Sequence, residues 1–399
     1  QAKLVIDLRA TLLPLRLYLA TALDRLRAEA LGLAADARSA GRRSAEAAAQ
    51  VTLGEVAWLQ DDLDTAEGHF ATGNRLSLEV GFTRKRLWSL LGLAQVAIEL
   101  TTQPDGTADV EAELHLAEAV RLLDEALVQA RRAGQVKLVI ELRATLLPPR
   151  LYLATPLDRL RAEALGLAAD AHSAGRRSAE AAAQVTLGEV AWLQDDLEAA
   201  EGHLAAGNRL SLEVGFTRKR LWSLLGLAQV AIARGQPEAA RRLAQEAIEL
   251  TTQPDGTADV EAELHLAEAC LAGGDLGEAA AAVARAWAVL QEVDVFSRAR
   301  LQRTEARLAM ASGDPAGAVA LLERSLAALE ATGHRLDRLH SLIDLARALR
   351  QAGRDDEAEA TAKGAGDQAA AMGAHALVRR LAGDGVPGPA ASRAGGDGR

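Results

Sequence analysis

Apolar residues recur every three or four positions along most of this chain, in runs of roughly 15–18 residues. The run LHSLIDLARALRQAG, residues 339–353, is one example. This spacing places the apolar side chains on one face of an α-helix, so each run predicts an amphipathic helix. Gly, Pro and Asp interrupt the runs, as expected where one helix ends and the next is capped. Because no β-rich segment breaks the pattern, the sequence predicts an all-α fold.

Small residues recur at intervals of 39 or 40 in the second half of the chain, each after a turn such as LQDDLEA or AGGDLGEA. Two helical runs fit within each interval. Such a period is typical of a helical solenoid, in which every hairpin packs on its neighbours. We therefore expect a solenoid of antiparallel helix hairpins in units of about 40 residues. The recurrent small residues are Ala200, Ala240, Ala279, Ala318 and Ala358.

The segment LGEVAWLQDDLEAAEGHL, residues 187–204, resembles the tetratricopeptide repeat (TPR). The resemblance covers roughly residues 1–375, although the units are nearer 40 residues than the usual 34. Most aromatic residues of the usual first helix are replaced by Ala, Leu and Gln. The resemblance implies a right-handed superhelix with a concave groove for a protein or peptide partner. The signature positions are matched by Leu187, Gly188, Ala200 and Leu204, and in an earlier unit by Leu53, Gly54, Ala66 and Phe70.

Two long segments of the chain are nearly identical. Residues 1–97 align with 135–231 without a gap, and 88 of the 97 pairs are identical. Residues 98–119 then match 248–269, so the first copy lacks sixteen residues that form a turn and most of a helix. We expect residues 107–133 to fold back as a longer helix in place of the missing partner.

This duplication predicts the domain organisation. A first TPR-like copy, lacking one helix, spans residues 1–134, and a second copy with further TPR-like units spans 135–382. Residues 383–399 are rich in Gly, Pro and small polar residues, which predicts a disordered tail. The chain begins with Gln rather than Met, which favours a piece of a longer protein.

The formal net charge of −10 argues against direct nucleic-acid binding, since phosphate recognition needs a concentrated basic surface. The one cysteine, Cys270, excludes a disulfide framework and favours a reducing cytoplasm. The apolar N-terminal stretch carries charges at Lys3, Asp7 and Arg9, so we expect no membrane segment. Self-association stays open.

Motifs of catalysis and cofactor binding are absent from the sequence. It contains no GxxxxGK[ST], no GxGxxG after a strand, no HExxH, no GxSxG and no CxxC. His334 and His340 are six residues apart, a spacing that suits no common metal site. The acidic stretch TTQPDGTADVEAE, at 101–113 and again at 251–263, lacks the ligand series of a calcium loop. We therefore expect no enzyme activity, no cofactor and no metal.

Tryptophan residues occupy matching places in the two copies and indicate a binding surface. Trp58 and Trp192 end the first helices of hairpins, whereas Trp88 and Trp222 begin the next ones after the basic segment GFTRKR. Tryptophan is enriched at binding hot spots because it buries a large area with little loss of flexibility. The alternative is that each ring fills a gap between Ala-rich helices. The candidate groove comprises Trp58, Trp88, Glu189, Trp192, Trp222, Gln229, Glu268, Arg303 and Arg307.

The segment RLLDEALVQARRAGQVKLVIELRATLL, residues 121–147, resembles part of the helical arm of large ATP-binding transcription regulators of the LuxR class. That resemblance implies a non-catalytic scaffold for protein–protein interaction or effector sensing within a bacterial signalling or transcription regulator. Two other interpretations stay open, namely a free-standing cytoplasmic adaptor and the repeat arm of an ATPase or nucleotide-cyclase fusion. The sequence identifies neither the partner nor the effector.

Overall fold

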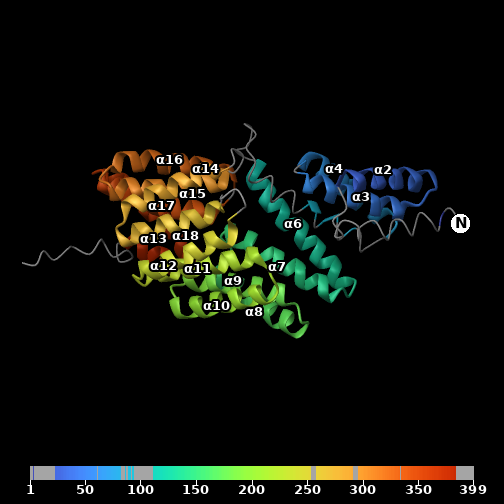
Figure 1. Ribbon diagram of the computed structural model, residues 1–399, viewed down its shortest axis with the longest axis horizontal. Coiled ribbons are helices and arrows are strands. Elements are labelled where there is room, and N and C mark those ends of the chain that lie inside the picture. The colour runs from blue at the N-terminus through green and yellow to red at the C-terminus, as the bar shows by residue number, and fades with distance from the viewer. Residues whose placement is uncertain are drawn as a thin grey trace, which may run out of the picture. The chain divides into compact units, whose positions relative to one another are not determined.

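The computed structural model describes residues 3, 23–60, 62–81, 86, 89–90, 92–93, 111–252, 258–290, 295–332 and 334–382. Within these ranges it contains seventeen α-helices and no strand (Figure 1). The all-α fold predicted from the apolar spacing is therefore confirmed. None of the helices in this part of the chain combines the length and apolar character needed to cross a bilayer.

The chain divides into two compact units. Unit 1 comprises residues 1–103 and 110–146, and unit 2 comprises residues 104–109 and 147–399. The predicted boundary after residue 134 stays a prediction, and the predicted disordered tail lies outside the described residues. The helices of unit 1, together with the helix in which the chain passes to unit 2, are α2 (Leu23–Ser39), α3 (Arg43–Leu59), α4 (Leu63–Glu79), α6 (Glu111–Arg132) and α7 (Val136–Tyr152).

Among the described residues of unit 1, helix α6 is the longest helix, with 22 residues. Its residue Leu123 shares one buried apolar cluster with Leu90, from the preceding helical segment, and with Leu142 of α7. Arg86 also forms an ion pair with Glu125 of α6. Helix α6 therefore packs against both of its neighbours in the sequence. The connection over residues 94–110 lies outside the described part, so the fold-back hairpin stays a prediction.

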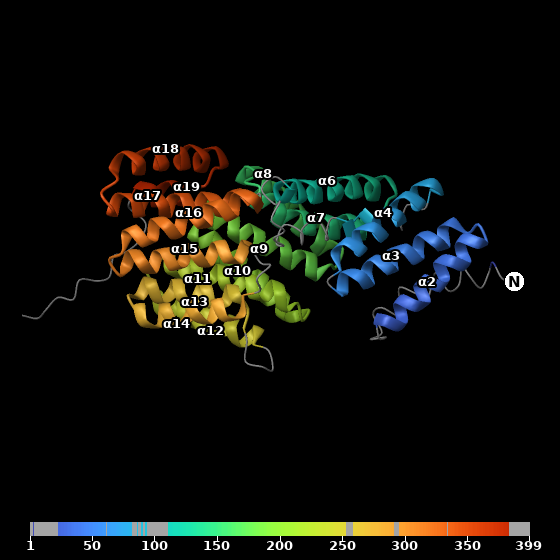
Figure 2. The same cartoon turned by 90° about the horizontal axis from the view of Figure 1, so that it is seen from above.

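Unit 2 is a regular series of helix hairpins that stack side by side (Figures 1 and 2). The second helices of successive hairpins begin at residues 197, 237, 276, 315 and 355, which confirms the predicted period near 40. The helices are α8 (Leu157–Ser173), α9 (Arg177–Leu193), α10 (Leu197–Glu213), α11 (Thr217–Ala233), α12 (Pro237–Thr251), α13 (Val260–Gly273), α14 (Leu276–Val289), α15 (Val295–Ala311), α16 (Pro315–Thr332), α17 (Arg335–Gln351), α18 (Asp355–Met372) and α19 (His375–Ala382).

In two of the hairpins, an aspartate in the turn caps the second helix. The side chain of Asp196 accepts a hydrogen bond from the backbone nitrogen of Ala199 at 3.0 Å, at the start of α10. Asp275 accepts one from the backbone nitrogen of Glu278 at 3.1 Å, at the start of α14. Each bond satisfies an amide that has no partner within the first helical turn. The second Asp of LQDDLEA and the Asp of AGGDLGEA therefore act as helix caps.

The small signature residues are explained by close helix crossings. A methyl group at Gly188 of α9 or at Gly226 of α11 would lie within 3.0 Å of the Leu204 side chain on α10. In unit 1, Gly54 of α3 is pressed in the same way against Phe70 of α4. Only a residue without a Cβ leaves room for the large side chain between the crossing helices.

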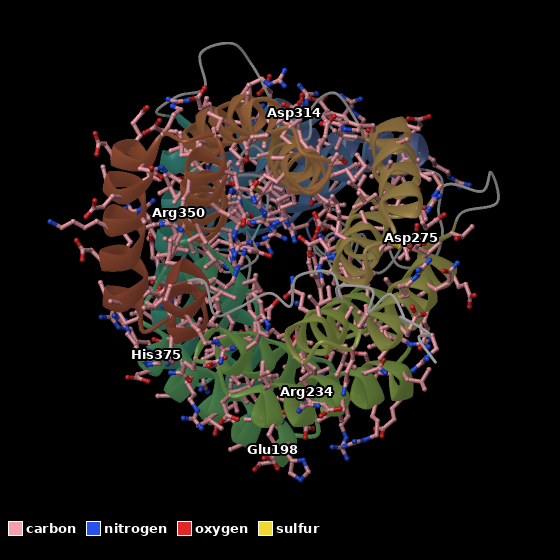
Figure 3. The ribbon with its side chains drawn as sticks, turned by 90° about the vertical axis from the view of Figure 1, so that its left-hand side faces the viewer. Glu198, Arg234, Asp275, Asp314, Arg350 and His375 are labelled. Carbon is pink, nitrogen blue, oxygen red and sulfur yellow. The ribbon has the colours of Figure 1, made fainter. Side chains whose placement is uncertain are left out.

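The first helices of the hairpins form the inner wall of a ring in unit 2. Helices α9, α11, α13, α15, α17 and α19 each contact the next member of this series, and α19 returns to contact α9. An ion pair between Arg379 of α19 and Asp195, just after α9, joins the two ends. Figure 3 shows the ring viewed along its axis, and the labelled residues follow one another around its circumference. The predicted concave surface is thus the interior of a closed ring.

Candidate ligand-binding cavity

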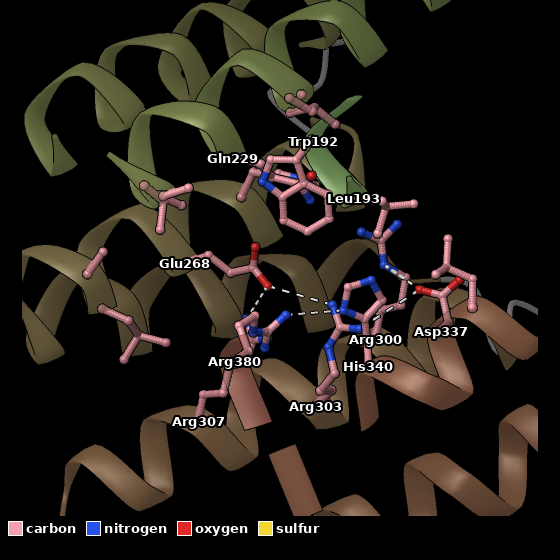
Figure 4. Close-up of a pocket in the computed structure, with 18 of the residues that line it drawn as sticks. Trp192, Leu193, Gln229, Glu268, Arg300, Arg303, Arg307, Asp337, His340 and Arg380 are labelled. Carbon is pink, nitrogen blue, oxygen red and sulfur yellow. Dashed lines mark hydrogen bonds and ion pairs between the residues drawn. The ribbon is translucent and has the colours of Figure 1, made fainter. Parts of the chain in front are cut away.

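A cavity of about 520 Å³ lies within the ring of unit 2 (Figure 4). The inner helices line it, and it therefore lies where the sequence placed the groove. Of the predicted groove residues, the side chain of Trp58 and the whole of Trp88 are outside the described part. All of the remaining ones line this cavity, namely Glu189, Trp192, Trp222, Gln229, Glu268, Arg303 and Arg307. The structure brings them together, and their role in binding stays a prediction.

One part of the cavity wall is aromatic and apolar. Trp192 of α9 and Trp222 of α11 are both half-buried there, next to apolar residues such as Leu225 and Leu271. The Trp192 ring stacks on the imidazole of His340, with 6.0 Å between the ring centres and an angle of 23° between the planes. This contact joins α9 to α17, so Trp192 takes part both in the cavity wall and in the closure of the ring.

Another part of the wall is a cluster of arginines on α15. Arg300, Arg303 and Arg307 are spaced three and four residues apart, which places them on one face of the helix. Buried carboxylates from α13 and α17 surround them. Arg303 and Arg307 were predicted from the sequence, but several other residues of this network were not, although a charge within an apolar run such as LIDLARALR was a usable signal. The missed lining residues include Tyr152, His265, Arg300, Asp337, His340 and Arg380.

Arg307 is held at the centre of a ladder of hydrogen bonds. Its Nε donates to Oδ2 of Asp344 at 2.7 Å, and its Nη1 donates to Oε1 of Glu268 at 2.8 Å. Arg380 of α19 donates from Nη2 to the other oxygen of Asp344 at 3.1 Å. Burial by itself raises the pKa of both carboxyl groups. The arginines outweigh this effect and lower the pKa of Glu268 and of Asp344 to about 2.

Arg303 lies in the same cluster but makes longer contacts. Its guanidinium nitrogens are 3.8 Å from Glu268, 3.9 Å from Asp337 and 3.9 Å from Asp344. These distances exceed those of a hydrogen bond. Nε and Nη1 are buried and donate no hydrogen bond to any residue that the structure describes. Burial, together with the neighbouring Arg307, lowers the pKa of Arg303.

The two histidines of the cavity are neutral polar links between helices. Nδ1–H of His265 donates to the backbone oxygen of Glu261 at 2.7 Å, and Nε2 accepts from the Gln229 amide at 3.1 Å. Burial lowers the pKa of His265 to about 4. His340 accepts a bond from Arg380 at Nδ1, at 3.2 Å, and burial lowers its pKa well below the usual value. Neither joins a metal site, since no three ligand-type side chains converge among the described residues.

Glu189 and Tyr152 occupy the part of the wall nearest α7. Burial raises the pKa of Glu189 to about 7, and Lys219 offsets part of that effect. The Tyr152 ring packs edge-on against Phe296 at 5.9 Å and against His334 at 5.3 Å, between ring centres. Functional sites frequently contain a buried carboxyl group whose pKa is raised toward 7.

Two other features that the sequence analysis considered are structural in unit 2. Cys270 is fully buried in the apolar cluster between α13 and α14. In the basic segment GFTRKR, Arg220 donates to Glu246 of α12 at 2.6 Å. Both contacts hold neighbouring helices together.

Comparison with solved structures places the fold. A Rap conjugation gene regulator of the plasmid pLS20, solved in complex with the Phr* peptide, is similar over 75% of this chain and 78% of its own, at 13% identity and a TM-score of 0.53. The apo quorum sensor NprR from B. thuringiensis is similar over 91% of this chain and 97% of its own, at 11% identity and a TM-score of 0.51. This chain has a TPR-like helical repeat fold.

The other comparisons add little to this TPR-like assignment. BtubC (BKLC) from P. vanneervenii matches 55% of this chain and 92% of its own at 20% identity, but the TM-score of 0.39 is too low to support an argument. No family model matches the TPR-like chain, and no curated protein matches it in sequence. The likeness therefore concerns the fold, and the function has to be argued from the cavity.

Proposed function

We propose that this TPR-like protein is a non-catalytic recognition module, and that unit 2 holds a segment of a protein or peptide partner in its central cavity. The observation that carries the proposal is the convergence of two tryptophans and an arginine cluster on one cavity within the ring. Tryptophan and arginine are the residues most enriched at binding hot spots, because they combine large contact area with directed polar contacts.

The size of the cavity favours a short segment over a folded domain. A volume of about 520 Å³ falls within the range of pockets that enclose small ligands, which is roughly 300–1,000 Å³. A few amino-acid side chains fill such a space. The peptide complex of the Rap regulator supports this choice by analogy of fold, since that protein is solved with a peptide.

The chemistry of the wall supports a role in binding rather than catalysis. Among the described residues that line the cavity there is no Ser, Thr, Cys or Lys to act as a nucleophile. The two histidines already use ring nitrogens in hydrogen bonds within the protein, His265 through both nitrogens and His340 through Nδ1. The arginines are in addition permanently charged, so they suit anion recognition better than proton transfer.

For the biological setting, we propose a place within a bacterial signalling or transcription regulator. The LuxR-class resemblance of residues 121–147, which span the end of α6 and most of α7, supports this setting. A free-standing adaptor is the alternative. An immunoblot of the source cells with an antibody to residues 276–382 separates them. A band near 41.9 kDa supports the adaptor, and a much larger band supports the regulator.

The binding proposal is tested with a library of random hexapeptides on the full chain. We expect the library to yield peptides that bind the wild-type protein, and Trp222→Ala to weaken them about tenfold or more. Trp287, which is exposed on the outer helix α14, provides the matched control, and Trp287→Ala should leave the affinity unchanged. A library without binders, or binders that respond equally to both substitutions, refutes the proposal.

A further inference from the structure

We infer that the segment held in the cavity carries a carboxylate group, and that Arg303 receives it. This inference rests on the proposed function, because it names the chemistry of the group that enters the same cavity. It concerns a single subsite, on the face of α15 that carries the arginine cluster.

Arg303 is buried in the cavity wall without a close anionic partner. The side chain is only 6% exposed, and it lines the cavity from the middle of α15. Arg307, its neighbour on the same helix, forms hydrogen bonds shorter than 3.0 Å to both Glu268 and Asp344. Arg303 is left at 3.8 Å or more from each carboxylate within reach. A buried guanidinium is costly to leave without hydrogen bonds, so a bound carboxylate would supply what the protein itself does not.

The charges around the cavity also favour an anionic ligand. The arginines of the wall outnumber the carboxylates that face them, five to four, so one positive charge is in excess. Glu189 and Lys219 interact with each other and do not alter this balance. The groups counted are Arg300, Arg303, Arg307, Arg347 and Arg380 on one side, and Glu261, Glu268, Asp337 and Asp344 on the other.

The same balance favours a carboxylate over a phosphate. One excess positive charge is neutralised by one monoanion, whereas a phosphate with close to two charges would be repelled by the carboxylates that already surround Arg303. A carboxylate also matches the planar guanidinium and accepts two parallel hydrogen bonds from it. Nε and Nη1 of Arg303 lie on different edges of the guanidinium and neither donates a hydrogen bond among the described residues, so either of them can form the pair of bonds together with Nη2.

The aromatic wall indicates what lies beside the carboxylate. Trp192 and the arginine cluster lie on different helices that meet around the same cavity (Figure 4). A group that reaches Arg303 therefore brings the adjoining part of the ligand against an indole ring, where an apolar or planar side chain buries the most area. The ligand is thus a peptide with an acidic group next to an apolar residue. The acidic group is either an Asp or Glu side chain or the chain terminus.

The test compares matched peptides on the wild-type protein. Each selected hexapeptide is made in its acidic form, with Asn or Gln in place of Asp or Glu, and with the free C-terminal carboxylate replaced by an amide. Titration calorimetry at constant ionic strength gives the affinities. We expect one of the two neutral replacements to weaken binding about tenfold or more, and the replacement that does so identifies the source of the carboxylate.

A double-mutant cycle then assigns the carboxylate to Arg303. In Arg303→Met the affinity for the acidic peptide should fall to that of its neutral form, and the neutral peptide should bind both proteins within about twofold. Arg303→Lys keeps the charge and should retain part of the preference, which covers the case in which Arg303→Met folds poorly. Arg241→Met, on the outer surface and paired with Asp275, is the control and should leave the preference unchanged.

The melting temperatures of two variants distinguish a ligand-binding role of Arg303 from a structural role. Arg307→Met removes the hydrogen-bonded partner of Glu268 and Asp344, so it should lower the melting temperature clearly. Arg303→Met removes no hydrogen bond within the cluster and should lower the melting temperature far less. Equal losses for the two variants would show that Arg303 serves the fold and would overturn the inference.

The outcomes for the inference and for the proposed function are distinct. Peptides that bind equally well in acidic and neutral forms overturn the carboxylate subsite and leave the binding module standing. An acid preference that persists in Arg303→Met also overturns it, because another residue then receives the group. A library without any binder overturns both.

Discussion

Asp344→Asn should destabilise unit 2 because it removes the negative charge that binds both Arg307 and Arg380. Asp344 is fully buried on α17 and accepts hydrogen bonds from Arg307 and from Arg380. Asparagine has nearly the same shape and still offers one oxygen, so the packing is preserved and the lost charge is the main change. The substitution leaves two buried guanidinium groups facing a neutral partner.

Two independent estimates give the size of this effect. Removing one partner of a buried ion pair costs about 3–5 kcal/mol. The pKa of Asp344, lowered from 3.8 to about 2, corresponds to about 2 kcal/mol of stabilisation of the charged form, at 1.36 kcal/mol for each pKa unit. We take about 3 kcal/mol as the expected loss. For a unit of this size, about 2 °C per kcal/mol gives a fall in melting temperature of about 6 °C.

Scanning calorimetry at neutral pH measures this change in the full chain. A separate transition of unit 1, if the two units melt apart, should stay in place and serves as an internal control. Asp367→Asn, at an exposed position of α18, is the matched control and should shift the transition by less than about 1 °C. If Asp344→Asn shifts the transition no more than this control does, the ladder does not stabilise the ring.

Three further predictions follow from the packing and the charges. Gly188→Ala places a methyl group against the Leu204 side chain and should lower the free energy of unfolding by about 1–3 kcal/mol. Urea unfolding measures this change. The double variant Gly188→Ala with Leu204→Ala should recover part of the lost stability. Trp222→Ala should weaken a library-selected peptide while Trp287→Ala does not, measured by calorimetry well below the melting temperature of either variant. Because the pKa of Glu268 is lowered from 4.5 to about 2, its contribution to stability is complete above pH 4.5 and is lost as the pH falls toward 2, which acid unfolding followed by circular dichroism checks.

Much of the repeat architecture could be predicted, because it depends on neighbours in the sequence. Ala recurs at the equivalents of position 200, and a small residue, Gly188 or Ala, recurs at the equivalents of position 188, because every hairpin has the same close helix crossing. The phase of the repeat also identifies the inner face. Glu189, Gln229 and Glu268 each directly follow the recurrent small residue of the first helix, so counting along the repeat was enough to place them on one surface.

The closure of the ring could not be predicted from this pattern. It depends on contacts between residues far apart in the chain, such as Arg379 with Asp195 and His340 with Trp192. A repeat pattern reports how each hairpin meets the next one, but a small change of rotation per unit decides whether the last helix meets the first. The pattern therefore leaves an open groove and a closed ring equally compatible with the sequence.

The part of the charged network around Asp344 and Arg380 was missed for a related reason. Asp344 lies within an apolar run, and its partners Arg307 and Arg380 are 37 and 36 residues away. When one helix is considered alone, a charged residue such as Asp344 is expected to face solvent. Its burial becomes reasonable only when the charges of neighbouring inner helices are considered at the spacing of the repeat.

The central claim, that a partner segment lies inside the ring of unit 2, is tested most directly by photo-crosslinking. A library-selected hexapeptide that carries benzoylphenylalanine in place of its apolar residue is irradiated with the full chain, and the attachment site is mapped by mass spectrometry. The account predicts attachment to the residues that line the cavity, within 151–152, 189–193, 222–233, 265–272, 300–311 or 336–351, or at Arg380. Attachment to the outer helices α10, α12, α14, α16 and α18, or to unit 1, would contradict it.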